Sequence, residues 1–150
     1  MGPDVEIVAI TNDGGQLVEA GWLEKSEPVH RQLRPQLPAA YAVRMREIFA
    51  AGGRMAVVVA DGEVVSVAVW RLIEDTNTGR RVYVDDLVSD AARRSTGAGR
   101  LLLNWLEDKA RHLGCAVLTL DSGVQRHDAH RFYFREGMTI LAYSFRKALK

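Results

Sequence analysis

The sequence predicts a mixed α/β (α+β) domain, and two observations about its elements support this fold class. In the middle of the chain, the apolar runs 55–60 and 64–72 flank Asp61-Gly62, which is a strong signal for an antiparallel β-hairpin. In the second half, strand patterns alternate with helical patterns, and this alternation is typical of parallel pairing. The central sheet is therefore expected to be mixed.

The elements are expected in the order strand, two helices, three strands, helix, strand, helix, strand. The first half should hold a strand at 5–10, a helix at 16–25, an irregular proline-rich piece at 26–38 and a helix between Pro38 and Gly52. After the hairpin we expect a strand at 81–88, a helix at 97–113, a strand at 115–120, a short helix ending at Gly137 and a last strand at 138–146.

Composition and length limit the classes of protein that fit. The 150 residues predict a single domain, 1–150, and 20 Lys and Arg against 19 Asp and Glu argue against a dedicated nucleic-acid binder. No apolar run approaches a membrane span, and the first residues carry no secretion signal. The one cysteine, Cys115, is interpreted as a buried small hydrophobic residue. We expect a cytoplasmic protein with no nucleic-acid or membrane partner, and a homodimer stays open.

The segment 93–100 is the most informative about chemistry. Its glycines let backbone N–H groups approach an anion, and the helix that follows adds unpaired N–H groups and the positive end of its dipole. Arg93, Arg94 and Arg100 supply positive charge that suits phosphates. The pattern indicates a phosphate-binding loop, with a Gly-rich connection carrying solvated arginines as the alternative. It is not a Walker loop, because no Lys-Ser/Thr pair follows the last glycine.

Two motifs make this sequence similar to the GNAT superfamily of N-acetyltransferases. Arg94-Ser95-Thr96-Gly97-Ala98-Gly99 fits the pyrophosphate-loop pattern Arg/Gln-x-x-Gly-x-Gly/Ala of that family, between a strand and a helix. Ala129-His130-Arg131-Phe132-Tyr133, followed by Gly137, resembles the family's last short helix. The order of elements agrees over about residues 5 to 146. The resemblance implies a mostly antiparallel central sheet with a parallel splayed pair, flanked by about four helices.

The same resemblance implies acetyl-CoA as co-substrate. It assigns the cofactor-binding site to Leu87, Val88, Arg93, Arg94, Ser95, Thr96, Gly97, Ala98, Gly99, Arg100 and Arg126. Arg126 stands where relatives often have Asn, so contacts to the pantetheine arm or the phosphates should differ there. No metal is expected, because His127 and His130 beside Asp128 lack a recognisable ligand set.

Acetyl transfer to an amine requires a neutral amine, a polarised carbonyl and a proton for the leaving thiolate. Asp85 and Asp86 end the strand before the loop, and neighbours in a regular strand point to opposite faces, so without a bulge only one can face a given site. The resemblance favours Asp85 over Asp86 for removing the amine proton. For each residue the alternative is that the carboxylate binds an arginine or caps a backbone turn. The resemblance implicates the backbone N–H groups of Leu87 and Val88 in polarising the carbonyl.

The resemblance also makes Tyr133 the acid that protonates the departing sulfur, and a simple core aromatic is the alternative. His30 lies in the proline-rich piece and is expected to be an exposed loop histidine, with contact to an acceptor as the alternative. The sequence thus predicts an acetyl-CoA-dependent N-acetyltransferase acting on a primary amine of a small-molecule acceptor. A catalytically silent acyl-CoA-binding regulatory module is the alternative function.

Overall fold

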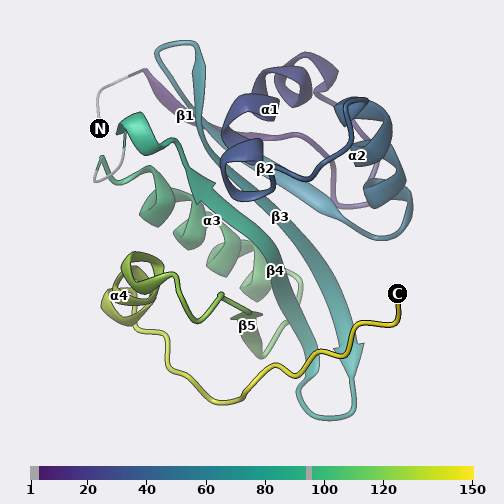
Figure 1. Ribbon diagram of the computed structural model, residues 1–150, viewed down its shortest axis with the longest axis vertical. Helices are drawn as coiled ribbons and strands as arrows, with labels where there is room; N and C mark the ends of the chain where they lie inside the picture. The colour runs from purple at the N-terminus through teal and green to yellow at the C-terminus, as the bar shows by residue number, and fades with distance from the viewer. Residues whose placement is uncertain (1–3, 94–95) are drawn as a thin grey trace. The chain divides into compact units, whose positions relative to one another are not determined.

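A computed structural model describes residues 4–93 and 96–150 of the chain (Figure 1). The chain divides into two compact units, one up to Thr119 and one from Leu120 onward. In chain order, the elements are β1 (Val5–Ala9), α1 (Ala20–Leu33), α2 (Tyr41–Ala50), β2 (Arg54–Ala60), β3 (Glu63–Asp75), β4 (Gly79–Ser89), a 3-10 helix (Ala91–Arg93), α3 (Ala98–His112), β5 (Val117–Leu120) and α4 (His127–Arg135). The predicted order is confirmed as far as the last helix.

The strands form one sheet in the order β1-β2-β3-β4-β5. The first four strands pair antiparallel with their neighbours, and β4 and β5 run parallel. The predicted mixed fold class is therefore confirmed, with four α-helices among the described residues. In those residues no helix has the length and apolar character that crossing a membrane requires.

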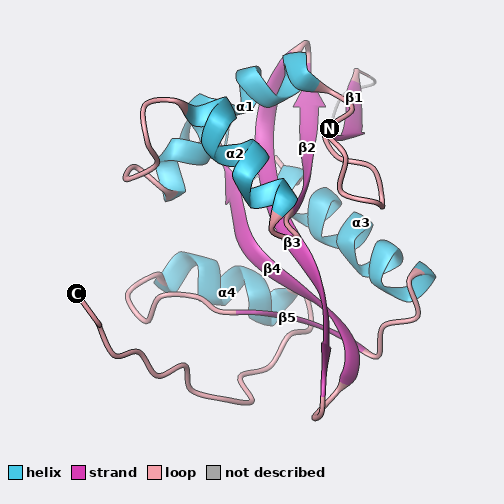
Figure 2. Ribbon diagram, turned by 90° about the vertical axis from the view of Figure 1, so that its right-hand side faces the viewer, coloured by secondary structure: helices cyan, strands magenta, loops and turns pink. Residues whose placement is uncertain are grey.

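In the N-terminal unit, helices cover both faces of the sheet. Figure 2 shows α1 and α2 on one side of β2 to β4 and α3 on the other. The core under α1 and α2 joins side chains of both helices to alternate residues of the strands, among them Leu23, Met45, Phe49, Val57, Val67, Val69 and Val88. From α3, the buried side chains are Ala98, Leu102, Leu103, Leu106 and Ala110. The strands of the N-terminal unit are therefore held between the layer of α1 and α2 and the layer of α3.

Helix α3 offers a matched test of its buried face. Leu106 is fully buried, whereas Leu101 on the same helix is 38% exposed. We expect Leu106→Ala to lower the free energy of unfolding by about 2–5 kcal/mol, because it removes apolar contacts and leaves a cavity. Leu101→Ala should cost less than about 1 kcal/mol. Urea denaturation of both variants measures the difference, and equal losses would contradict the assignment of the buried face.

The structure corrects the predicted helix at 16–25 and the predicted irregular piece at 26–38. Helix α1 instead runs through this boundary with Pro28 inside it. An internal proline costs about 3 kcal/mol because it removes a backbone hydrogen bond and its ring crowds the preceding turn. Leu23 and Val29 are both buried on the same helix, and each such burial stabilises by about 1.5–3 kcal/mol. Packing therefore outweighs the local preference of the proline.

The predicted last strand at 138–146 is also wrong. Residues 138–150 have no regular secondary structure, and Leu141, Tyr143 and Phe145 are each more than 80% exposed. The alternation of apolar residues shows that this segment could form a strand. A strand also needs the backbone of a neighbour for its hydrogen bonds, and within the described ranges no ladder includes this segment.

The start of β5 differs from the prediction as well. The strand begins at Val117, and Cys115 lies in the turn after α3, where its N–H donates to the Ala110 carbonyl oxygen at 2.9 Å. Cys115 is consequently half-buried, which corrects the expectation of a buried residue. The apolar run alone could not show where the turn ends and the strand begins.

Candidate active site

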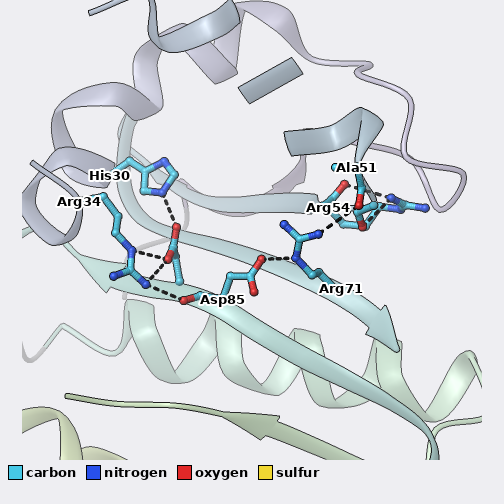
Figure 3. A network of polar contacts seen from close by, with 9 residues as sticks. His30, Arg34, Ala51, Arg54, Arg71 and Asp85 are labelled. Atoms are coloured by element: carbon cyan, nitrogen blue, oxygen red, sulfur yellow. Dashed lines mark hydrogen bonds and ion pairs between the residues drawn. The ribbon is translucent and has the colours of Figure 1, made fainter. Parts of the chain in front are cut away.

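A β-bulge in β4 places both acidic residues of the predicted pair on one face of the sheet. Val69 of β3 pairs with Asp86. The next residue, Trp70, pairs with Val84, so Asp85 is an extra residue in β4. An extra residue breaks the alternation of side chains along a strand. Both carboxylates lie on the side that α1 and α2 cover, where Figure 3 shows their partners.

Asp86 is the more enclosed carboxylate, with its side chain 12% exposed. Its Oδ2 lies 2.7 Å from Nε2 of His30, and its Oδ1 accepts a hydrogen bond from Nε of Arg34 at 2.7 Å. Burial by itself would raise the pKa of Asp86, but the contacts with His30 and Arg34 outweigh it and hold this pKa below its ordinary value. Asp86 is therefore a carboxylate at neutral pH.

Asp85 has different surroundings. Its Oδ2 accepts one hydrogen bond, at 2.6 Å, from Nε of Arg71 on β3, and its backbone oxygen accepts another from Arg34 at 3.0 Å. Burial raises the pKa of Asp85 above its ordinary value by more than Arg71 lowers it, and the negative charge of Asp86 adds to the rise. Two adjacent carboxyl groups are thus pushed in opposite directions, a pattern typical of acid–base sites.

His30 is not the exposed loop residue that the sequence predicted. It lies in α1 with its side chain 1% exposed, and its Nδ1 is 2.7 Å from the hydroxyl of Tyr41, the first residue of α2. Leu23 and Ser26, seven and four residues earlier, lie on the same buried face. This spacing of 23, 26 and 30 indicates one face of a helix, but the prolines around it led to the prediction of an irregular segment.

A pocket of about 400 Å³ lies between α1 and the start of α2. Its lining residues are Glu24, Glu27, Ala40, Tyr41, Ala42 and Val43. Glu27 is paired with Arg31 at 2.7 Å, and over the described ranges no ion pair includes Glu24. Pro28 has no N–H group, so the Glu24 carbonyl oxygen lacks its usual helical donor. The pocket lining therefore includes two acidic residues, Glu24 and Glu27, and such a lining suits a group carrying N–H donors.

The predicted phosphate loop leads directly into α3. Gly97 precedes the helix with φ of 89°, a conformation that other residues adopt only under strain. The Thr96 hydroxyl donates to the Arg93 carbonyl oxygen at 2.8 Å. Arg94 and Ser95, both predicted to bind the cofactor, lie outside the described residues.

The other residues predicted for the cofactor lie in β4, in the 3-10 helix and in the first turn of α3. Arg93 forms an ion pair with Glu63. Leu87 and Val88 follow the acidic pair in β4, are both 8% exposed, and pair with Ala68 and Val67 of β3. In the first turn of α3, Ala98 is buried, Gly99 is half-buried and Arg100 is exposed. The acidic pair, these strand residues and the loop thus occur in sequence along β4 and into α3.

Tyr133 and Arg126 belong to the C-terminal unit. Tyr133 lies on α4 and is 9% exposed, and the positive charge of Arg126, at the start of α4, acts on its hydroxyl group. Burial raises the pKa of Tyr133, and Arg126 offsets only part of this rise. A guanidinium has no acceptor, so the tyrosine keeps its own hydrogen for another partner. Tyr133 is a protonated donor at neutral pH.

The histidines of α4 have other partners. Nε2 of His130 is 2.8 Å from the Gly123 carbonyl oxygen, and Asp128 forms an ion pair with Arg131. In the part of the chain that the structure describes, no group of three or more His, Cys, Asp or Glu could hold a metal ion.

Two curated proteins are similar to part of this chain. An uncharacterized N-acetyltransferase of Bacillus subtilis is 47% identical over 70 residues, which cover 46% of this chain and 49% of that protein. Aminoalkylphosphonate N-acetyltransferase of Salmonella typhimurium is 39% identical over 66 residues, covering 44% and 43%. The chain thus matches about half the length of these curated relatives.

Solved structures match over nearly the whole chain. An acetyltransferase of Trypanosoma brucei has a TM-score of 0.76 at 22% identity and covers 97% of this chain and 100% of its own. An aminoglycoside N-acetyltransferase solved in complex with CoA has a TM-score of 0.80 at 17% identity, covering 98% and 97%. At these identities the likeness establishes the fold.

The family model described as the acetyltransferase (GNAT) family matches residues 17–138. The chain therefore belongs to the acetyltransferase (GNAT) family.

Proposed function

We propose that this protein is an acetyl-CoA-dependent N-acetyltransferase that moves the acetyl group directly to a primary amine of a small molecule. The observation that carries the proposal is the bulge, because it puts Asp85 and Asp86 side by side on one face with different surroundings. A carboxyl group with a raised pKa beside a fixed charge suits proton removal near neutral pH. The net charge of +1 supports a small acceptor over a nucleic acid. We also propose that the protein is cytoplasmic.

The loop at 93–100 fits the pyrophosphate of the donor. Gly97 lets the chain turn into α3, whose first N–H groups lack carbonyl partners within the helix and can donate to phosphate oxygens. Arg93 would exchange Glu63 for a phosphate, and Arg94 and Arg100 would add further charge. The CoA in a solved structure of the same fold supports this choice of donor.

Acetyl-CoA supplies an acetyl group activated as a thioester. In the proposed reaction, Asp85 takes the proton from the amine as the amine nitrogen forms its bond to the acetyl carbon. Backbone N–H groups of Leu87 and Val88 stabilise the negative charge on the acetyl oxygen. Tyr133 donates its proton to the sulfur as the carbon–sulfur bond breaks, and the positive charge of Arg126 favours this release because it lowers the pKa of Tyr133.

The pocket between α1 and α2 supports an acceptor that carries positive charge. Glu24 and Glu27 line it, and an ammonium group donates three hydrogen bonds that carboxylate and carbonyl oxygens can accept. A curated relative named for aminoalkylphosphonates and a solved structure named for aminoglycosides agree with small amine acceptors. Neither name identifies the acceptor of this chain.

A direct test is a screen of amines with acetyl-CoA, read by release of the free CoA thiol. Thermal shift with acetyl-CoA, CoA and ATP accompanies it, because a ligand that binds the native state stabilises it. Acetyl-CoA binding with thiol release that depends on the amine is expected. Binding without turnover across the library would favour the silent acyl-CoA-binding module, and stabilisation by ATP alone would contradict both functions.

The loop assignment predicts a loss of donor affinity in Gly97→Val. A valine disfavours the positive φ at this position and takes backbone N–H groups out of reach of the phosphates. Losing one charge-assisted hydrogen bond costs about 1.5–3 kcal/mol, so the Kd for acetyl-CoA should rise at least about tenfold. Isothermal titration calorimetry measures the change.

Gly114→Val is the matched control for this variant. Gly114 follows the other end of α3 with φ of 75°, and an added Cβ meets nothing within 4 Å at either glycine. The control therefore carries a similar backbone cost away from the loop and should keep the wild-type affinity. An unchanged affinity in folded Gly97→Val would remove the loop from the binding site.

A further inference from the structure

Asp86 of the acidic pair is the end of a hydrogen-bonded chain of three side chains from three elements, of which Tyr41 and His30 are buried. Tyr41 of α2 lies 2.7 Å from Nδ1 of His30 on α1, and Nε2 of His30 lies 2.7 Å from Oδ2 of Asp86 on β4. Tyr41 is 3% exposed and the His30 side chain 1%. The chain thus connects a wall of the pocket to the bulge, all within the N-terminal unit.

Hydrogen-bonding capacity explains why a histidine suits this position. Asp86 as a carboxylate only accepts, so Nε2 of His30 must carry a hydrogen. The Tyr41 hydroxyl can donate to Nδ1 when the imidazole is neutral, or accept from it when the ring is charged. Both forms of His30 therefore satisfy every contact, and Asp86 receives a donor in each.

Charged groups reach the pair from α1 and β3. From α1 come His30 and Arg34, and from β3 comes Arg71. Tyr41 of α2 contacts His30, and the charges of Glu27 and Arg31 act on Tyr41. Two donors converge on Asp86, whereas Asp85 has one side-chain donor.

We propose that His30 is a positioning residue that keeps Asp86 ionised and thereby leaves Asp85 as the carboxyl group that exchanges a proton in the reaction. The part of this inference that concerns the reaction rests on the proposed function. The negative charge of Asp86 disfavours ionisation of Asp85 and so makes Asp85 a stronger base. If Asp86 took up a proton, this effect and the Arg34 ion pair would both be lost.

Two substitutions separate the contacts of His30. In His30→Gln, the amide nitrogen can take the place of Nε2 and keep the hydrogen bond to Asp86. In His30→Asn, the shorter amide can take the place of Nδ1 and keep only the contact with Tyr41. The variants are similar in polarity and differ chiefly in which partner they lose.

Residue-resolved ¹³C NMR titration of the carboxyl groups of Asp85 and Asp86 in the full chain is the primary readout. In the wild type we expect Asp86 to be protonated at lower pH than Asp85. In His30→Asn the pKa of Asp86 should rise by about one pH unit or more and that of Asp85 should fall. In His30→Gln the pKa of Asp86 should stay within about half a pH unit of the wild type.

The pH profile of kcat/KM is the second readout. In His30→Asn the acid limb should move to lower pH and the plateau should fall, because a less basic Asp85 is a weaker base. A merely structural role would lower activity or stability without moving this limb.

The wild-type titration needs no variant to fold and no turnover to occur. If Asp86 is protonated at higher pH than Asp85, or if His30→Asn titrates like the wild type, the inference is overturned. Missing turnover in the wild type would contradict the proposed function alone.

Discussion

Replacing Tyr133 with phenylalanine should lower kcat by about 100- to 10,000-fold while acetyl-CoA affinity stays nearly unchanged. The substitution keeps the ring, which is 9% exposed, and removes only the hydroxyl group on which the charge of Arg126 acts. A phenol has an ordinary pKa near 10 and a thiol one near 8.5, so a tyrosine still holds its proton when the nascent thiolate needs it. Burial raises the pKa of Tyr133 further.

Stopped-flow measurement of the chemical step, with calorimetry for the donor, checks this result. Tyr143→Phe is the control, because Tyr143 lies in the same unit and is 84% exposed. A core aromatic without a chemical role would give nearly normal turnover in Tyr133→Phe. Such a result, under conditions where chemistry limits the rate, would remove Tyr133 from the mechanism.

Asp85→Asn should lower kcat/KM by about 100- to 10,000-fold near neutral pH. The wild type should lose activity as the pH falls through the raised pKa of Asp85, because the carboxyl must be ionised to accept a proton. The variant depends on amine that is already neutral, and this fraction grows as the pH approaches the amine pKa of about 10. The deficit should therefore shrink steadily toward alkaline pH.

Asp86→Asn is the comparison for this experiment. His30 and Arg34 keep Asp86 ionised, and in the proposed mechanism Asp86 does not exchange a proton. Asp86→Asn should therefore lower kcat/KM less than Asp85→Asn does, and it should move the acid limb of the pH profile to lower pH. A full pH–rate profile of both variants decides the assignment. If Asp86→Asn is inactive and Asp85→Asn is normal, the roles of the two residues are reversed.

Most of the fold could be predicted from local patterns. Asp61 and Gly62 both have positive φ, as the predicted two-residue hairpin turn requires. Helix α3 begins one residue after the predicted start, because Gly97 and the apolar stripe mark it clearly. Helix α1 could not be predicted in this way, since its extent depends on burial against the sheet, which no local pattern around Pro28 reveals.

The loop and the acidic pair of the candidate site were found in the sequence, whereas its geometry was not. The bulge did leave a trace, because Val82 and Val84 are two residues apart and the next buried residue, Leu87, follows after three. That change of spacing indicates an extra residue in the strand. The partnership of His30 with Asp86 joins residues 56 positions apart, so only the packing of α1 on β4 could reveal it.

The presence of two carboxylates on one face depends on the one extra residue in β4 as well as on the residue types at positions 85 and 86. Val69 and Trp70 pair with Asp86 and Val84, so a chain without residue 85 would continue the same ladder with no register change on either side. The core positions before and after that point would keep their faces, and one carboxylate would remain where two now lie. Deletion of the codon for residue 85 would therefore remove the proposed base and leave the pairing of the sheet unchanged. A comparison of substitutions among relatives would not detect such a deletion.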